Sequence, residues 1–433
     1  MNQCSQTNAL LAGGAALNLW LAVALLQSPA GASAQEALRN SLAAQALAET
    51  NKIDLESMPY TFKSGDFRLL VTPSMEVDWN DNINLSSSDA KQDFILRPLV
   101  QFDASYPISQ VNLLRVDVGA GYDEYLEHSA YSNWRVNSGS QLSFDTYIKD
   151  FLINLHDRAS YIQDPAAQAV VAGTGSYAVA RNVVGVAGIW NPKDMNMSLG
   201  YDHENIMSPS RQFQLQNSSS ELFDGRVGWR FLPTATAGIE GTYSMTAYDQ
   251  AILNNNSAYT AGGYGEWRPG SYFRGTARGG YTIYQFQQTS ASAETIEFTP
   301  TGKPIRTSDL NSWYADVTLS HDITRALSYS LSVGHEIQVG FLSDTVEDSY
   351  VRLSSAWKII KNLDLRGSFS YEHGQQGVGN VTGNLTEIFD WYAGNVEISR
   401  QLSTKLRVGL NSRVTYRTRK TCCASMKAGK AHG

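Results

Sequence analysis

Long apolar runs are missing from this chain of 433 residues once the first 30 residues have passed. A helix that crosses a membrane needs about 20 consecutive apolar residues, so this absence excludes a helical membrane protein. A basic stripe is missing too, and the net charge is only −7. The charge therefore does not indicate a nucleic-acid partner.

Cysteine is almost absent. Cys4, Cys422 and Cys423 are the only three in the chain, so the body of the sequence has none. This excludes a disulfide-stapled fold and a cysteine-based metal cluster. We expect no bound metal and no cofactor. Glycine (35) and tyrosine (22) are abundant instead.

The first 34 residues are organised like a secretory signal peptide. Residues 9–26 form an apolar core, and Ala32-Ser33-Ala34 before Gln35 matches a small-residue cleavage site. The region before the core has no Lys or Arg, which leaves a short membrane anchor as the alternative. Residues 35–66 then predict a periplasmic leader that is partly helical, with helical spacing over 35–60.

Apolar and polar residues alternate from Phe67 almost to the end of the chain. For example, Leu327, Tyr329 and Leu331 alternate with Ser328 and Ser330. Because side chains point to opposite faces along a strand, each such strand shows one face to an apolar medium and the other to water.

The lengths of the connections separate a membrane barrel from a soluble sandwich. We predict seventeen strands, with short and long connections in strict alternation, at 67–79, 94–106, 111–123, 134–147, 151–162, 178–190, 195–204, 219–231, 235–248, 258–268, 271–286, 310–321, 326–341, 349–360, 363–373, 387–401 and 405–417. Short turns on one side and long loops on the other are typical of bacterial outer-membrane barrels. The sequence therefore predicts an all-β fold over 67–417, a transmembrane antiparallel up-and-down β-barrel of about 16–18 strands.

Aromatic residues gather near the predicted strand ends. Barrels carry an aromatic girdle at each membrane interface. The residues that we assign to girdles are Tyr122, Tyr125, Trp134, Trp190, Trp229, Phe231, Tyr243, Trp267, Trp313, Trp357, Trp391 and Tyr416. The alternative is that some are aromatics in their ordinary role as strand formers.

The end of the sequence departs from the barrel pattern. Single-chain bacterial barrels have even strand numbers, so an eighteenth strand should follow the seventeenth. Residues 418–433 show no alternation instead, and we expect a disordered tail there. Our hypothesis is that the closing strand has been lost from the reading frame.

The polar phase of the strands predicts a water-filled lumen. The charged residues in this phase that we expect to line the lumen and set its selectivity are Arg97, Arg115, Asp117, Arg135, Arg274, Arg278, Asp316, Arg352, Arg366, Glu397, Arg407 and Arg413. Facing walls of opposite sign would produce a transverse field across the lumen. Ordinary charge pairs solvated by lumen water explain the same residues equally well.

Catalytic motifs are missing as well. The seven histidines lie in no G-x-S-x-G or H-E-x-x-H context. His335 falls on the lipid-facing phase, where a bulge or a place near the interface explains it better than catalysis does. We therefore expect no enzymatic activity, and a membrane-embedded hydrolase is the least favoured function.

The opening of the predicted barrel, residues 70–103, resembles the β-barrel porin family often found near exopolysaccharide loci. The resemblance rests on a first strand with Pro73, an Asp/Asn-rich loop at Asn80-Asp81-Asn82, and a second strand that carries Pro98. In layout it extends to about residue 416. The resemblance implies a porin-like role, with a link to polysaccharide export, and it supplies no catalytic residues.

We thus predict an outer-membrane channel that passes small hydrophilic solutes or saccharides. Its expected partners are outer-membrane lipid and lipopolysaccharide, the barrel-assembly machinery and the solutes themselves. The alternative is a non-transporting barrel that anchors or scaffolds an envelope assembly, with its lumen plugged by residues 35–60 or by a folded loop.

Overall fold

The computed structural model describes residues 4–6, 16–22, 59–84, 89–162, 178–209, 214, 217–250, 255–287, 310–338, 346–377, 385–403 and 406–423. All twenty of its strands belong to a single sheet. Among the described residues, no helix is long and apolar enough to cross a membrane. A single 3-10 turn, Ser129–Tyr131, interrupts the described strands and loops.

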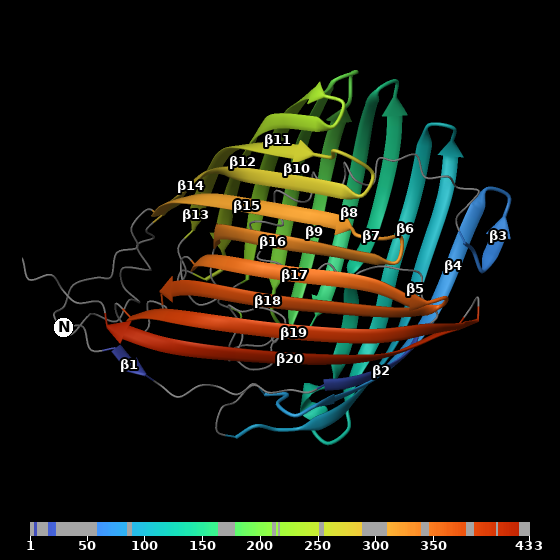
Figure 1. Ribbon diagram of the computed structural model, residues 1–433, viewed down its shortest axis with the longest axis vertical. Coiled ribbons are helices and arrows are strands. Elements are labelled where there is room, and N and C mark those ends of the chain that lie inside the picture. The colour runs from blue at the N-terminus through green and yellow to red at the C-terminus, as the bar shows by residue number, and fades with distance from the viewer. Residues whose placement is uncertain are drawn as a thin grey trace, which may run out of the picture.

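Seventeen strands follow one another around the sheet, each pairing antiparallel with the next. They are β4 (Phe67–Asn80), β5 (Asp93–Ser109), β6 (Asn112–Tyr125), β7 (Asn133–Ile148), β8 (Phe151–Ile162), β9 (Val179–Trp190), β10 (Met195–Met207), β11 (Ser218–Leu232), β12 (Ala235–Tyr248), β13 (Asn256–Trp267), β14 (Phe273–Phe286), β15 (Leu310–Asp322), β16 (Leu327–Gln338), β17 (Val346–Ile360), β18 (Leu363–Gly377), β19 (Leu385–Ser403) and β20 (Leu406–Cys423). The prediction of seventeen strands is confirmed. In Figure 1, β14 to β20 cross in front of the earlier strands, as tilted strands on two sides of a barrel do.

The connections confirm the predicted alternation. Those after β5, β7 and every second strand onward have two to five residues, whereas the others have seven to 23. Two of the two-residue turns contain a residue with positive φ, Lys149 (φ 58°) and Asn362 (φ 67°), a conformation that tight hairpin turns use. One rim of the barrel therefore carries the short turns, and the other carries the long loops.

Strand β2 (Ala16–Ala22) closes the barrel. It pairs antiparallel with β20 over Arg407–Arg413 and with β4 over Ser74–Val77. We call the position between β20 and β4 the seam. The short strand β1 (Cys4–Gln6) also pairs with β20, and β3 (Phe62–Ser64) forms a hairpin with β4. An odd set of seventeen strands thus becomes an even one of eighteen.

The closing strand lies within the segment that the sequence predicts to be a signal peptide. A segment that is removed at Ala34 cannot also close the mature barrel. We expect the mature protein to begin at Gln35, because the apolar core and the cleavage site lie in the required order. Amino-terminal sequencing of the protein from outer membranes will test this. A mature chain that still contains β2 would contradict the prediction and would assign the seam to this segment.

One of the predicted domain boundaries needs correction. Strand β20 runs on to Cys423, so the barrel extends past residue 417 and residues 418–423 are not part of a disordered tail. Within the predicted leader, Phe62–Ser64 form β3, which lies after the range 35–60 where helical spacing was found. Residues 35–58 of the leader and the tail from 424 to 433 lie outside the described residues.

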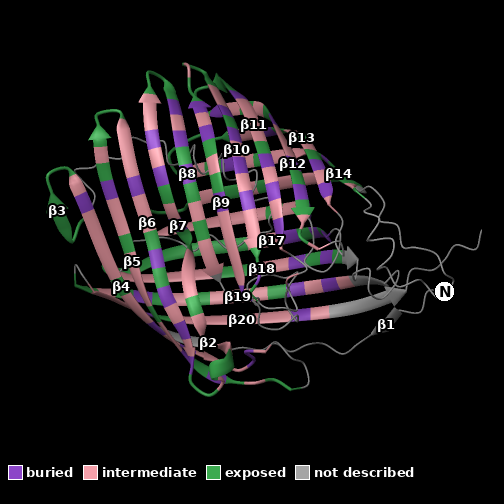
Figure 2. Cartoon of the chain, turned by 180° about the vertical axis from the view of Figure 1, so that it is seen from behind, coloured by how far each residue is buried: buried purple, intermediate pink, exposed green. Residues whose placement is uncertain are grey.

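The two faces of the sheet differ sharply in character, and Figure 2 shows buried positions separated by intermediate or exposed ones along many of the strands. Ile239 is 69 % exposed, whereas the neighbouring Glu240 is 9 % exposed. Large apolar residues on the exposed phase include Leu199, Leu353, Phe369 and Val396. A face that is apolar and exposed on a closed barrel is one that lipid covers.

Aromatic side chains border this apolar band on the outer face. Toward the long-loop rim, Tyr201 contacts Phe223 (ring centroids 5.0 Å apart) and Tyr243 contacts Tyr259 (4.8 Å). Toward the short-turn rim lie the exposed rings of Trp190, Trp229, Trp267 and Trp357. Two girdles around an apolar band are the architecture of a bacterial outer-membrane barrel, and this chain is an outer-membrane protein of that type.

Three of the aromatic residues assigned to the girdles, Trp313, Trp391 and Tyr125, show where that assignment holds and where it does not. His335 lies on the outer face and stacks on Trp313, with ring centroids 4.1 Å apart, so its place near the interface agrees with the sequence analysis. Trp391 and Tyr125, however, are each only 6 % exposed and pack in hydrophobic clusters with other buried residues. Their strand phase points them inward, and their assignment to the girdles was wrong.

Candidate functional site

The polar phase of the strands is the concave, inner face of the barrel. Tyr314 on β15 donates a hydrogen bond to Glu240 on β12 (2.9 Å), and Tyr264 on β13 donates one to Asn196 on β10 (3.1 Å). In both cases two strands lie between the partners. Side chains three strands apart converge only on the concave side of a curved sheet, so this face surrounds the lumen.

All twelve charged residues predicted to line the lumen lie on this inner face, as the strand register shows. Most of the arginines among them are paired with a carboxylate. Arg97 contacts Asp78 (3.1 Å) and Glu76 (3.6 Å), and Arg97 and Arg135 both approach Asp123. On β4 to β7, Arg97 and Arg135 are therefore surrounded by more carboxylates than there are arginines.

A continuous ladder of polar contacts runs along the inner face from β6 to β10. Arg115 donates to Asp145 (2.8 Å), which also accepts a hydrogen bond from Asn154 (2.6 Å). Next along the ladder, His156 lies 2.8 Å from Asn154 and 2.7 Å from Asp202. Of these residues only Arg115 belongs to the set that the sequence predicts to determine selectivity. Their even spacing along the strands places them in the lumen phase, but no motif identifies them.

The most concentrated cluster centres on Glu240. Arg278 donates two hydrogen bonds to it from Nε and Nη2 (3.0 and 2.8 Å), and Arg226 approaches it to 3.8 Å. The guanidinium of Arg226 also lies 3.5 Å from the ring centroid of Tyr264. One buried carboxylate thus holds two arginines and a tyrosine hydroxyl in place on the lumen wall.

Glycines allow the tyrosines to lie across the wall. A side chain at Gly262 or Gly280 would collide with Tyr314, and one at Gly334 would collide with Tyr350. Tyr350 reaches over Gly334 to donate to Asp316 (2.9 Å). The rings therefore lie along the wall and fill the space that the glycines leave, in a pattern repeated on β13, β15 and β17.

Replacing Gly280 with alanine is expected to destabilise the barrel by about 1–3 kcal/mol, the range for overpacking. The added Cβ would lie 2.6 Å from the Cα of Gly262 and would collide with the backbone at Ala261, neither of which can move like a side chain. Gly394→Ala is the matched control, because no atom lies within 4 Å of the added Cβ. Urea unfolding in detergent will compare the two variants, and equal midpoints would contradict this account of the wall.

The arginines of the last strands do not form a bare positive wall. Arg352 pairs with Glu372 (2.9 Å), Arg407 with Asp364 (3.0 Å) and Arg366 approaches Glu397 (3.9 Å). Likewise, Arg274 lies 3.7 Å from Glu266. The charge-pair alternative of the sequence analysis therefore describes these residues better than unpaired arginines do.

The balance of charge nevertheless differs around the barrel. On β4 to β6 the inner face carries three arginines (Arg68, Arg97 and Arg115) and a larger acidic set, Glu76, Asp78, Asp93, Asp103, Asp117 and Asp123. Among the residues of β17 to β20 whose side chains the structure describes, it carries four carboxylates (Asp348, Asp364, Glu372 and Glu397) and a larger basic set, Arg352, Lys358, Arg366, Arg407, Arg413 and Arg417. The acidic region and the basic region meet at the seam. The sequence predicts walls of opposite charge that face each other across the lumen, but in the structure the two lie side by side.

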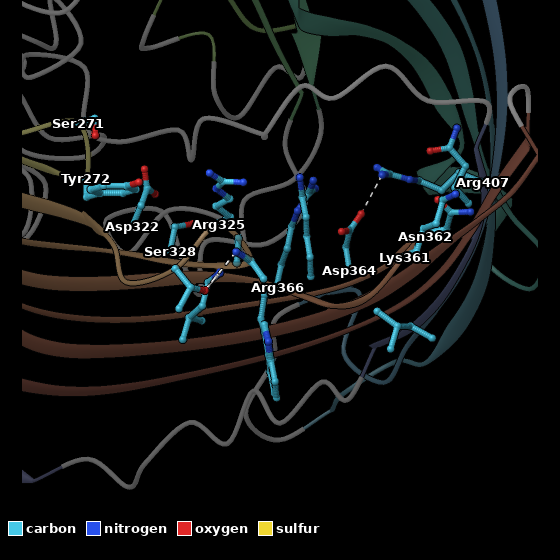
Figure 3. Close-up of a pocket in the computed structure, with 18 residues that line it drawn as sticks. Ser271, Tyr272, Asp322, Arg325, Ser328, Lys361, Asn362, Asp364, Arg366 and Arg407 are labelled. Carbon is cyan, nitrogen blue, oxygen red and sulfur yellow. Dashed lines mark hydrogen bonds and ion pairs between the residues drawn. The ribbon is translucent and has the colours of Figure 1, made fainter.

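A pocket of about 880 Å³ opens on the basic side of the lumen. It lies at the short-turn rim, where the turns after β15 and β17 and the start of β20 come together, and Figure 3 shows its side chains. The lumen-facing residue Ser354, which precedes the pocket on β17, is exposed, and so is Ala356 in the pocket lining. The sequence analysis selected Arg366 and Arg407 from its lining but missed the turn residues, because a turn has no strand phase.

Comparisons with known proteins find barrels and little sequence similarity. No family model matches the chain, and no curated protein matches it. A Pseudomonas aeruginosa protein, OccK2 (OpdF) in complex with glucuronate, is 9 % identical with a TM-score of 0.44, covering 81 % of this chain and 97 % of its own. OpdK of the same organism, with vanillate, is 10 % identical with a TM-score of 0.43, covering 82 % and 97 %. A bacterial polysaccharide outer membrane secretin is 10 % identical with a TM-score of 0.36, covering 82 % and 98 %. Similarity at these scores does not establish which solute, if any, this chain transports.

Proposed function

We propose that this chain is an outer-membrane channel that passes small hydrophilic solutes, saccharides among them. The seventeen strands β4 to β20, with or without β2, are in the size range that leaves an aqueous channel. The proposal rests on the inner face of the barrel, where each strand from β4 to β20 has charged or hydroxyl side chains. On this face Ser354, Ala356 and Lys358 are exposed. A lumen sealed by apolar packing would not need such a face.

The paired charges suit passage better than tight binding. An arginine that is already bound to a carboxylate offers its remaining donors to a passing solute without holding it strongly. Hydroxyls such as Ser320 and Ser330, 3.0 Å apart, offer hydrogen bonds that a saccharide can exchange for its own hydration. We include in the proposal a link to exopolysaccharide export, contact with lipopolysaccharide and insertion by the barrel-assembly machinery. The resemblance of residues 70–103 supports the first of these.

Exchanging Arg352, Arg366, Arg407 and Arg413 together for glutamine should shift ion selectivity toward cations. The exchange leaves Glu372, Glu397 and Asp364 without their arginine partners, so the basic region of the lumen becomes acidic. Reversal potentials in a salt gradient across a planar bilayer measure the shift. It should shrink at high salt, because exposed charges are screened beyond about 10 Å at 0.1 M.

The matched control exchanges four basic residues that lie outside this region, Arg68, Lys149, Lys193 and Arg268, for glutamine. It changes the net charge by the same amount and should move the reversal potential less. An unchanged potential in the lumen variant at low salt would show that these arginines do not influence permeation. Absence of any current would favour the plugged scaffold instead.

A further inference from the structure

The pocket at the short-turn rim has a composition that the passage of neutral solutes does not explain. Five basic side chains line it, Arg325, Lys358, Lys361, Arg366 and Arg407, against two carboxylates, Asp322 and Asp364. Arg325 comes from the turn after β15, three of the others from β17, β18 and the turn between them, and Arg407 from β20. The barrel therefore gathers positive charge at one place on its rim.

Three of the five cations have no acidic partner among the described residues. Asp364 is engaged by Arg407 at 3.0 Å, and Arg366 turns toward Glu397 at 3.9 Å. Within the described part of the chain, Arg325, Lys358 and Lys361 make no ion pair. Elsewhere in the lumen most arginines are matched by a carboxylate, so the unpaired cations distinguish this pocket from the rest of the wall.

The geometry points to a binding site for an oxyanion group, carboxylate or phosphate, on a small hydrophilic solute. The volume of about 880 Å³ lies within the range of small-molecule pockets and accommodates a sugar acid or sugar phosphate. Guanidinium and ammonium groups are the donors that bind such oxyanions. Tyr272, Asn362 and Gln401 in the lining offer hydrogen-bond partners for hydroxyl groups of the same solute.

The location of the pocket indicates the side of the membrane on which the solute binds. Short turns face the periplasm in bacterial outer-membrane barrels, so the pocket lies at the periplasmic mouth. An anion that binds there is either collected before export or received after import. The inference extends the proposed channel function, but binding itself requires no current through the barrel.

Isothermal titration calorimetry on the full chain in detergent tests the site without relying on conduction. The probes are glucuronate, glucose 6-phosphate and glucose, titrated separately at low salt. We expect heat from the two anions and none from glucose. Stronger binding of glucuronate would identify a carboxylate site, and stronger binding of glucose 6-phosphate a phosphate site.

The triple variant Arg325→Gln, Lys358→Gln and Lys361→Gln should weaken anion binding by about tenfold or more, which is ~1.4 kcal/mol. The control is Lys149→Gln with Lys193→Gln, which removes two cations from other short turns of the same rim, and it should bind as the unmodified protein does. Equal weakening in both would reduce the effect to general charge attraction and would overturn the inference. Equal heats for glucose and the anions, or no heat at all, would overturn it too.

The result can be separated from the channel proposal. In a planar bilayer, glucuronate added on the short-turn side alone should block current in the unmodified protein and not in the triple variant. If calorimetry shows binding but no current flows, the pocket stands and the channel fails. If current flows and no anion binds, the channel stands and the pocket fails.

Discussion

Replacing Leu331 with arginine is expected to cost about 2–4 kcal/mol of folding free energy, the range measured for cations at the lipid-facing midplane of barrels. Leu331 lies on the outer face, opposite Leu319 on β15 and Leu353 on β17. A guanidinium there would lie among lipid tails with no carboxylate near it. Unfolding by guanidinium chloride from lipid vesicles measures the loss.

Ser330→Arg is the matched control, one residue away on the same strand. Ser330 faces the lumen, where its hydroxyl lies 3.0 Å from that of Ser320 and where water and polar groups can solvate a cation. This variant should lose far less stability than Leu331→Arg. Equal losses would mean that the inner and outer faces have been exchanged.

Replacing Glu240 with alanine should destabilise the barrel by about 3 kcal/mol, the lower end of the range for breaking a buried ion pair. The side chain of Glu240 is 6 % exposed, and its loss leaves Arg278, Arg226 and the hydroxyl of Tyr314 without their common acceptor. Because Arg278 is 22 % exposed, water can replace part of what is lost. Equilibrium unfolding in detergent will measure the change.

Glu397→Ala provides the comparison for Glu240→Ala. Glu397 also faces an arginine across neighbouring strands, but it lies 3.9 Å from Arg366 and both side chains are more than a quarter exposed. Exposed pairs contribute about 0–1 kcal/mol, so this variant should unfold nearly as the unmodified protein does. A loss at Glu397 as large as that at Glu240 would contradict the central role given to the Glu240 cluster.

The strand set could be predicted because a strand exposed to lipid on one side and water on the other shows a period of two. That period also placed all twelve predicted lumen residues on the inner face. Trp391 was assigned wrongly although the signal was present. It is six residues from Glu397, an even spacing, and therefore shares the lumen phase of that residue.

Contacts across several strands could not be predicted in the same way. Tyr314 and Glu240 are 74 residues apart, and they meet because the sheet curves and because glycines on the strands between them leave room. Neither curvature nor the absence of an intervening side chain is visible in the period of a single strand. The closing strand was hidden for another reason. A short apolar run such as Ala16–Ala22 can be read as a strand or as part of a signal peptide, since periodicity alone does not separate buried strands from helices.

The central claim is that the polar inner face surrounds a conducting, water-filled lumen. Single-channel recording of the refolded full chain in a planar bilayer tests it most directly. We predict discrete current steps that scale with salt concentration and that keep their size when the outer-face residue Gly394 is changed to alanine. A correctly folded protein, shown by its strand content and by its resistance to unfolding in detergent, that produces no steps at any salt concentration would contradict the claim.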